Sequence, residues 1–296
     1  MNAFNLIPFA LAYIMFVLGL QLTLKDFLAL KRHPKAVLTG LFCQMLIVPT
    51  LAFLLVSMFS PPPSIAFGIM LLSFCAGGAT SNLLSFYAKG DVALAVTLTA
   101  VTSLACVVTM PLLIGVSFEH FMGTSAGVFN SQSMSLKVFV LTTLPVLIGM
   151  TVRHYFAKKI DKWQKPMQKF VNVLFVLLVV GAVASNWQLM LKHFVTIGAL
   201  VLLLAGLLLL CGMSVARLMG LPPKVQKTIA IETSLQNGAM GIALAPFIMH
   251  SVGQGLPEIA VPSAVYGVLM NLIVLPYVWW CMRDYTVRKS QFRVLK

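Results

Sequence analysis

Long apolar runs separated by short polar segments dominate the 296-residue chain. A helix needs about 20 consecutive apolar residues to cross a bilayer core about 30 Å thick. Runs of that length predict transmembrane helices over residues 6–23, 36–59, 64–88, 91–117, 135–156, 167–185, 194–219, 222–249 and 258–281. The pattern therefore predicts an all-α polytopic membrane protein with nine transmembrane helices, in a single transmembrane domain over residues 1–296.

The distribution of charge supports this interpretation and gives an orientation. Only 9% of the residues are charged, against about 25% in soluble domains. The net charge of +14 could suggest a nucleic-acid partner, but the basic residues recur in short loops and form no patch, which argues against one. With the N-terminus outside and the C-terminus inside, every Lys and Arg except Lys137 and Lys192 falls inside, as the positive-inside rule requires. We expect a multi-pass protein of a bacterial inner (plasma) membrane.

Two of the nine segments carry polar and small residues at their centres, and each is longer than one crossing requires. In the segment 64–88 these residues are Gly77, Gly78, Thr80, Ser81 and Asn82. In the segment 222–249 they are Glu232, Gln236, Asn237 and Gly238. Such residues disfavour a continuous helix, so we expect both segments to be discontinuous.

The two interruptions fall at the same depth in the membrane. Gln236 lies nine residues after Lys227, or about 14 Å from the inner surface at about 1.5 Å per residue. Gly78 lies eleven residues before Lys89, or about 16 Å from that surface. The two segments run in opposite directions. Antiparallel broken helices that meet at the midplane are typical of secondary transporters with inverted repeats.

Structural explanations of these residues remain open. Glycines in membrane helices commonly form packing surfaces, and Ser, Thr and Asn can hydrogen-bond between helices. Glu232 could belong to a structural ion pair. However, a central acid costs about 2.5–3.5 kcal/mol on insertion scales and is functional by default. The basic residues within other spans, which include Arg153 and Arg217, lie near the ends of those spans.

Three stretches, in this order and spacing, resemble the bile acid:sodium symporter family, and the resemblance covers nearly the whole chain. They are "HPKAVLTGLFCQMLIVP" (33–49), "GGATSNLLSFYAKGDVAL" (77–94) and "ETSLQNGAMGIALA" (232–245). The resemblance implies a core domain that contains two crossing discontinuous helices, beside a panel domain. It also implies coupling of organic-anion uptake to sodium, usually two ions, in the nine-helix form of the family.

The resemblance also implies site residues. The first sodium site would fall on Ser81, Asn82, Thr99 and Glu232, with Ala95 where the family has a further hydroxyl. The second would fall on the side chains of Gln44 and Gln236 and the backbone carbonyls of Glu232, Thr233 and Leu235. Asn271 matches a position that faces the substrate cavity, although Asn271 and Gln44 could equally be helix-to-helix contacts. The outgoing half-helices begin at Ala79, Thr80, Asn237 and Gly238, where we expect the anion to bind.

We therefore predict a sodium-coupled symporter that moves a small organic anion by alternating access. The anion would be bile-acid-like, pantoate-like or a keto or hydroxy acid. A proton-coupled transporter, with Glu232 as the proton relay, is the alternative. An intramembrane hydrolase using Ser81 would need a histidine or second acid at midplane depth, and the sequence shows neither, so we expect no enzyme.

Overall fold

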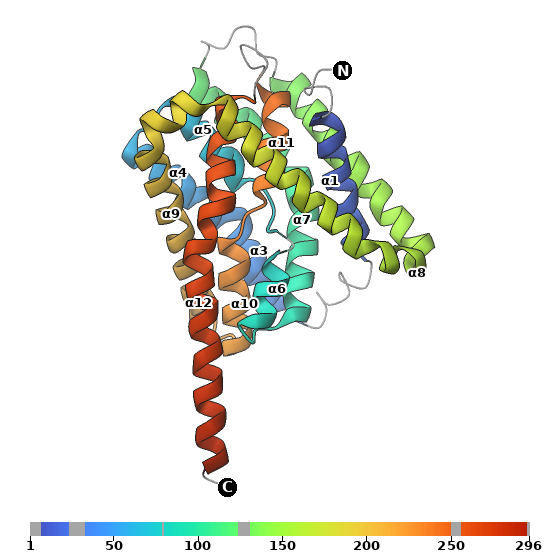
Figure 1. Ribbon diagram of the computed structural model, residues 1–296, viewed down its shortest axis with the longest axis vertical. Coiled ribbons are helices and arrows are strands. Elements are labelled where there is room, and N and C mark those ends of the chain that lie inside the picture. Colours follow the sequence, from blue (N-terminus) through green and yellow to red (C-terminus); the bar gives the residue numbers. More distant parts are fainter. Residues whose placement is uncertain (1–6, 24–32, 79, 124–130, 250–255, 295–296) are drawn as a thin grey trace.

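The described part of the chain is built from helices. The computed structural model describes residues 7–23, 33–78, 80–123, 131–249 and 256–294. In chain order its elements are α1 (Ile7–Gln21), α3 (Pro34–Phe42), η2 (Cys43–Ile47), α4 (Val48–Phe59), α5 (Pro63–Ser73), α6 (Thr80–Tyr87), α7 (Val92–Met122), α8 (Ser131–Ser185), α9 (Trp187–Leu218), α10 (Pro223–Ser234), α11 (Gly238–Ile248), η4 (Glu258–Ala260) and α12 (Val261–Val294). The predicted all-α class is confirmed (Figure 1).

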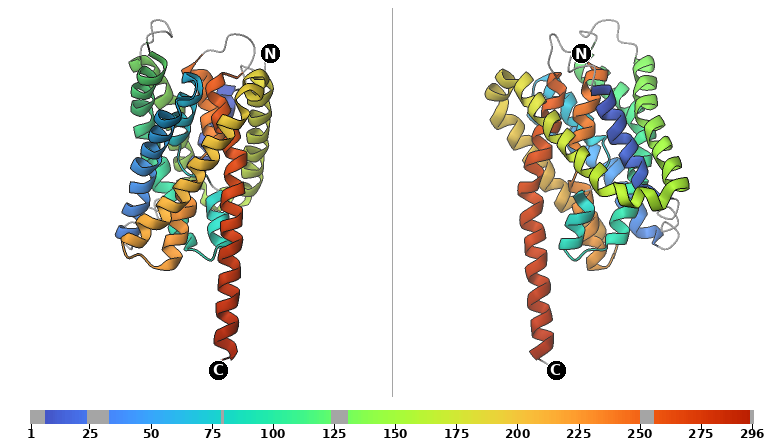
Figure 2. Two further views of the ribbon diagram at one scale, coloured as in Figure 1. Left: turned by 90° about the vertical axis from the view of Figure 1, so that its left-hand side faces the viewer. Right: turned by 45° about the vertical axis from the view of Figure 1, so that its right-hand side comes forward.

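The helices have the length and surface of a multi-pass membrane protein. Five helical segments of the described residues are long and apolar enough to cross a bilayer: Pro34–Phe59, Val92–Met122, Val138–Ser185, Trp187–Leu218 and Glu258–Arg283. Helices α1, α5 and α11 are apolar but shorter. Many large apolar side chains are exposed on these helices, as a lipid-facing surface requires. Helix α12 continues past the body to the C-terminus in both views of Figure 2.

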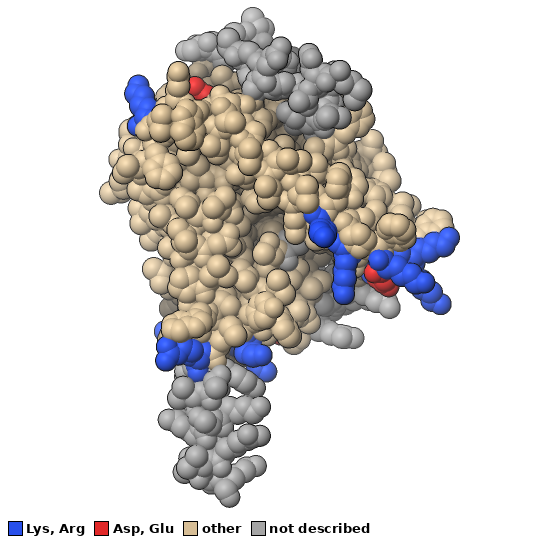
Figure 3. Space-filling view, in the orientation of Figure 1, with Lys and Arg blue, Asp and Glu red and all other residues tan. Residues whose placement is uncertain are grey.

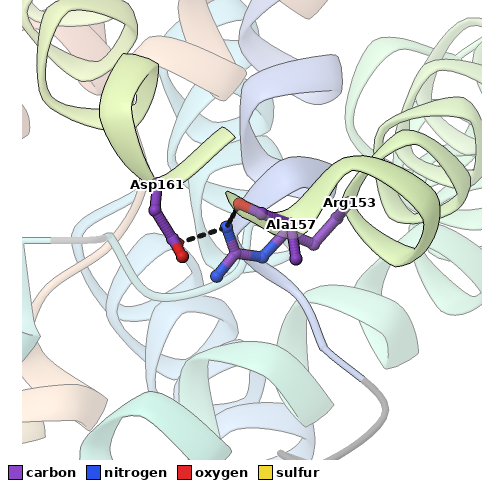
Figure 4. A network of polar contacts seen from close by, with 3 residues as sticks. All are labelled: Arg153, Ala157 and Asp161. Atoms are coloured by element: carbon purple, nitrogen blue, oxygen red, sulfur yellow. Dashed lines mark hydrogen bonds and ion pairs between the residues drawn. The ribbon is translucent and has the colours of Figure 1, made fainter. Parts of the chain in front are cut away.

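Helix α8 differs from its predicted form, since the loop expected between 156 and 167 is helical. The chain turns at one residue, Phe156, whose backbone (φ −121°, ψ 30°) is not helical. Arg153 spans this turn: its guanidinium lies 2.6 Å from a carboxylate oxygen of Asp161 and 3.4 Å from the Ala157 carbonyl (Figure 4). The basic residues that suggested a loop instead form the start of the second limb of α8.

Helix α1 packs along α8 at one side of the molecule (Figure 1). Glycines allow this close approach: a Cβ on Gly19 would overlap the carbonyl of Val146, and one on Gly149 would overlap the carbonyl of Phe16. Small residues at such contacts are the usual means of helix association in membranes. Of the remaining long helices, α9 packs against α10, α12 and α4, and α7 packs against α8 and α5.

Candidate functional site

Two helix interruptions form the centre of the molecule. Residues 74–79 separate α5 from α6, and residues 235–237 separate α10 from α11. Helix α10 ends because Leu235 is extended (φ −105°, ψ 109°). Helix α11 begins because the side chain of Asn237 accepts a hydrogen bond from the backbone N–H of Met240, at 3.1 Å, as an N-cap.

The interruptions hydrogen-bond to each other. Gly77 and Gln236 form an isolated antiparallel bridge. The backbone N–H of Asn237 donates to the carbonyl of Ala76 over 2.9 Å. Backbone outside a helix must find polar partners when it is buried in a membrane protein. Here each interruption supplies partners for the other, so the two broken helices cross in direct contact.

A buried carboxylate lies directly at this crossing. Glu232, in the last turns of α10, is 3% exposed. Thr99 of α7 donates its hydroxyl to Glu232 Oε1 over 2.6 Å and lies 3.4 Å from Asn82 Oδ1. Ser81 of α6 lies next to the same carboxylate and donates its own hydroxyl to the Gly78 carbonyl. The structure thus brings Ser81, Asn82, Thr99 and Glu232 together from three helices.

The helix that carries Gln44 is deformed at that residue. Residues 43–47 form one π-helical turn, in which the N–H of Val48 bonds to the carbonyl of Cys43. Pro49 follows and has no N–H to offer the carbonyl of Met45, which explains the irregular hydrogen bonding at this point. Short π-helical turns frequently occur at functional sites.

Gln44 also reaches the crossing, from η2. Its Nε2 donates to Gln236 Oε1 over 2.9 Å and to the carbonyl of Cys75 over 3.0 Å. Gln236 Nε2 in turn donates to the carbonyl of Thr233 over 3.0 Å. Gln44, Thr233 and Gln236 therefore form a second polar group around the interruptions.

A cavity of about 210 Å³ opens on the crossing. Of the residues predicted to bind the substrate, Thr80, Asn237 and Gly238 line it, and Ala79 lies outside the described residues. Four residues assigned to sodium also line the cavity: Asn82, Thr99, Leu235 and Gln236. Asn271 does not line it, and its amide hydrogen-bonds to the carbonyls of Gly267 and Val268 on its own helix.

The donor atoms at the crossing suit a hard cation. Within the described residues, no group of three or more His, Cys, Asp or Glu side chains could hold a metal ion. The crossing instead offers hydroxyl, amide and carbonyl oxygens around one carboxylate. Glu232 Oε2 and Gln44 Oε1 are buried and make no hydrogen bond to the described residues. A buried acceptor without a donor costs about 1–3 kcal/mol. A cation that prefers oxygen would satisfy both atoms.

Comparison with known proteins gives the family. Residues 8–220 match the model of the sodium bile acid symporter family. The chain belongs to that family. Sodium bile acid symporter family members are transporters, and this chain is therefore a membrane transporter and not an enzyme.

Named sodium-dependent transporters and cotransporters align over most of the chain. The uncharacterized sodium-dependent transporter YocS of Bacillus subtilis is 34% identical over 88% of this chain and 78% of its own length. The probable chloroplastic sodium/metabolite cotransporter BASS1 of Arabidopsis thaliana is 30% identical over 88% and 63%. The human ileal sodium/bile acid cotransporter is 30% identical over 77% and 65%.

Sequence reasoning missed one wall of the cavity. Four amide side chains from α1 and the second limb of α8 line it: Gln21, Gln164, Gln168 and Asn172. The last three are spaced four residues apart, which places them on one helix face. The spacing shows that these three amides share one helix face. Only the packed structure shows that this face lines the cavity at the crossing.

Ala95, where the family resemblance implies a hydroxyl, gives a first prediction. Ala95 is fully buried, one turn before Thr99, whose hydroxyl donates to the Ala95 carbonyl. Ala95→Ser should add an oxygen ligand beside Glu232. We expect the sodium concentration that gives half-maximal thermal stabilisation to fall about three- to tenfold, or about 0.7–1.4 kcal/mol.

Ala105→Ser is the matched control for this variant. Ala105 lies on the same helix and accepts a hydrogen bond from Thr109 in the same way, but it lies ten residues after Ala95, about 15 Å further along the helix. An unchanged sodium midpoint in Ala95→Ser, or an equal change in Ala105→Ser, would contradict the assignment of residue 95 to a sodium site.

Proposed function

We propose that the protein is a sodium-coupled symporter that carries a small organic anion by alternating access. The observation that carries the proposal is the buried Glu232 carboxylate at the crossing of two broken helices. Hydroxyl and amide oxygens from α6 and α7 surround it, and its Oε2 has no partner among the described residues. Membership of a sodium symporter family supports the same conclusion.

We propose nine membrane crossings arranged as an inverted repeat. The bend at Phe156 gives α8 two limbs, and the pairs α5–α6 and α10–α11 each provide one interrupted crossing. In Figure 3 most Lys and Arg side chains gather toward the end from which α12 extends and around the turn of α8. This distribution supports an inside C-terminus and an outside N-terminus, in a bacterial plasma membrane.

Two sodium ions would bind at the crossing, one on each polar group. The first group is Ser81, Asn82, Thr99 and Glu232. The second is the side chains of Gln44 and Gln236 with the carbonyls of Glu232, Thr233 and Leu235. The first group takes ligands from α6 and α10, one half of each broken helix, so a cation bound there would hold the two broken helices together. A cation on the second group would join η2 to the end of α10.

The anion would bind in the cavity where α6 and α11 begin. A helix N-terminus carries unpaired N–H groups and the positive end of the helix dipole, both of which favour an anion. Because sodium fixes the geometry of these N-termini, anion affinity should rise with sodium, and sodium affinity with the anion. The core helices would then move against α1 and α8, the proposed panel, and expose the cavity to the other side.

The decisive measurement is the thermal stability of the purified protein in sodium and in potassium at equal ionic strength. A ligand that binds only the native state stabilises it by about 2.7 kcal/mol at a concentration 100 times its Kd. We expect a saturable rise of the melting temperature in sodium that potassium does not reproduce. Equal melting temperatures in the two salts, with uptake into proteoliposomes that follows a pH gradient, would instead indicate proton coupling.

A further inference from the structure

The cavity wall that faces the crossing is made of neutral amides. Gln21 comes from the end of α1, and Gln164, Gln168 and Asn172 come from one face of the second limb of α8. We call these four residues the amide wall. In Figure 3 the surface is hollowed below this limb of α8. Residues of the proposed anion site at the start of α6 and α11 line the same cavity.

The amide wall is held in place by its own hydrogen bonds. Gln21 Nε2 donates to Gln168 Oε1 over 2.5 Å, and Gln168 Nε2 donates to Asn172 Oδ1 over 3.2 Å. A primary amide can donate two hydrogen bonds and accept two. Gln21, Gln168 and Asn172 therefore keep donors or acceptors for a ligand, while these hydrogen bonds fix their positions.

The remaining lining restricts the charge of the ligand. None of the described residues that line the cavity is Asp, Glu, Lys, Arg or His. A single negative charge would be compensated at the crossing, by sodium and by the N-termini of α6 and α11. A second charge, of either sign, would meet no charged side chain in the described lining, and the neutral amides would compensate it only in part.

The size of the cavity restricts the ligand further. Its volume of about 210 Å³ lies below the roughly 300–1,000 Å³ of pockets that hold drug-sized ligands. A rigid steroid would also place apolar surface against the amides and leave their hydrogen-bonding groups unpaired.

We propose that the amide wall determines substrate specificity, and that the substrate is a small monoanion with hydroxyl or carbonyl groups on the part remote from its carboxylate. The inference rests on the proposed transport function. The carboxylate would bind at the crossing, and the hydroxyl or carbonyl groups would bind Gln168, Asn172 and their neighbours. Apolar residues such as Val171 and Phe175, which also line the cavity, would contact the carbon chain.

A purely structural role for the wall makes a different prediction. If Gln21 and Gln168 served only to join α1 to α8, their removal would lower stability and weaken all ligands alike. If the wall recognises the substrate, its removal changes the ratio of affinities between a hydroxylated anion and its deoxy counterpart. The ratio within one variant is insensitive to a general loss of stability.

The test uses the purified full-length protein in saturating sodium, with binding measured by calorimetry. The probes are 4-keto, 5-keto and 5-hydroxy monoanions of five to six carbons, each with its unsubstituted counterpart, plus succinate and taurocholate. In the wild type we expect the best hydroxy or keto probe to bind about tenfold or more tightly than its counterpart, as one to two hydrogen bonds would give. Succinate and taurocholate should bind more weakly than that probe.

Two leucine variants remove the amides with little change in volume. Gln168→Leu and Asn172→Leu should each reduce the affinity ratio between the hydroxy or keto probe and its unsubstituted counterpart to about threefold or less. Neither variant should change the sodium concentration that gives half-maximal thermal stabilisation. Gln188→Leu, an exposed glutamine of α9 outside the cavity lining, should retain the wild-type preference.

The outcomes separate this inference from the proposed function. A sodium-specific rise in stability, combined with no preference for any hydroxylated or keto probe, would overturn the inference and keep the sodium-coupled transporter. The inference would also be overturned if both leucine variants kept the wild-type preference for the hydroxy or keto probe, or if taurocholate or succinate bound most tightly. Loss of the sodium effect itself in the wild type would overturn the proposed function.

Discussion

Glu232→Gln should abolish sodium-specific stabilisation and sodium-driven uptake. Glutamine keeps the size of the side chain and can still accept the Thr99 hydrogen bond, which is 2.6 Å long in the wild type. It removes the one carboxylate that offsets the charge of the proposed sodium ions. The Coulomb attraction between two opposite unit charges 4 Å apart is about 4 kcal/mol at an effective dielectric constant of 20. We therefore expect sodium affinity to fall by more than about 100-fold, measured as the shift of melting temperature against sodium concentration.

Glu258→Gln is the control, because Glu258 is acidic but exposed at the start of η4. It should keep the wild-type sodium midpoint. If Glu232→Gln also kept it, Glu232 would not be a sodium ligand. Wild-type uptake that follows a pH gradient and is indifferent to sodium, and that Glu232→Gln abolishes, would instead identify Glu232 as a proton carrier.

The second large effect is expected from Gly77→Ala. A Cβ at this position would lie 2.7 Å from Glu232 Oε1 and 3.2 Å from the carboxyl carbon, both closer than normal contacts. Gly77 also forms the bridge with Gln236, so neither backbone can withdraw without breaking the crossing. Overpacking of a buried site costs about 1–3 kcal/mol. We expect a lower melting temperature and a sodium midpoint raised by tenfold or more, since the carboxylate must move.

Gly78→Ala provides the matched comparison. A Cβ on Gly78 would meet only Thr80 Oγ1, at 3.9 Å, which is ordinary van der Waals contact. This neighbouring variant should show a near-normal sodium midpoint. Equal midpoints in the Gly77 and Gly78 variants would mean that the close approach of Gly77 to Glu232 has no part in sodium binding.

The sequence allowed the crossing to be predicted because its signals are local. A carboxylate such as Glu232 in an apolar segment raises the free energy of membrane insertion, whatever the positions of the neighbouring helices. Polar and small residues around Gly77 and Gln236 at equal depths similarly point to paired interruptions without any knowledge of packing. Gln44 was different: on its residues alone it could equally have joined two helices, and only the family resemblance connected it to the crossing.

Features that depend on helix packing could not be predicted in the same way. Gln164, Gln168 and Asn172 share a helix face, but the sequence does not say whether that face meets lipid, another helix or a cavity. The turn in α8 lies where the span 135–156 was predicted to end, at Phe156. What the sequence did not show is that the basic residues after it are helical rather than a loop.

The bridge between Gly77 and Gln236 has a consequence for how the protein is made. The partners at the crossing are distant in sequence: 192 residues separate Gln44 from Gln236, and 133 separate Thr99 from Glu232. During synthesis, the interruption at 74–79 enters the membrane long before the segment that supplies its hydrogen-bond partners. Contacts of such high sequence separation form late, after the loop-closure entropy has been overcome. Truncated chains that end before α10 should therefore remain open to water at this interruption, and biosynthesis should complete the ion site only when α10 and α11 are inserted.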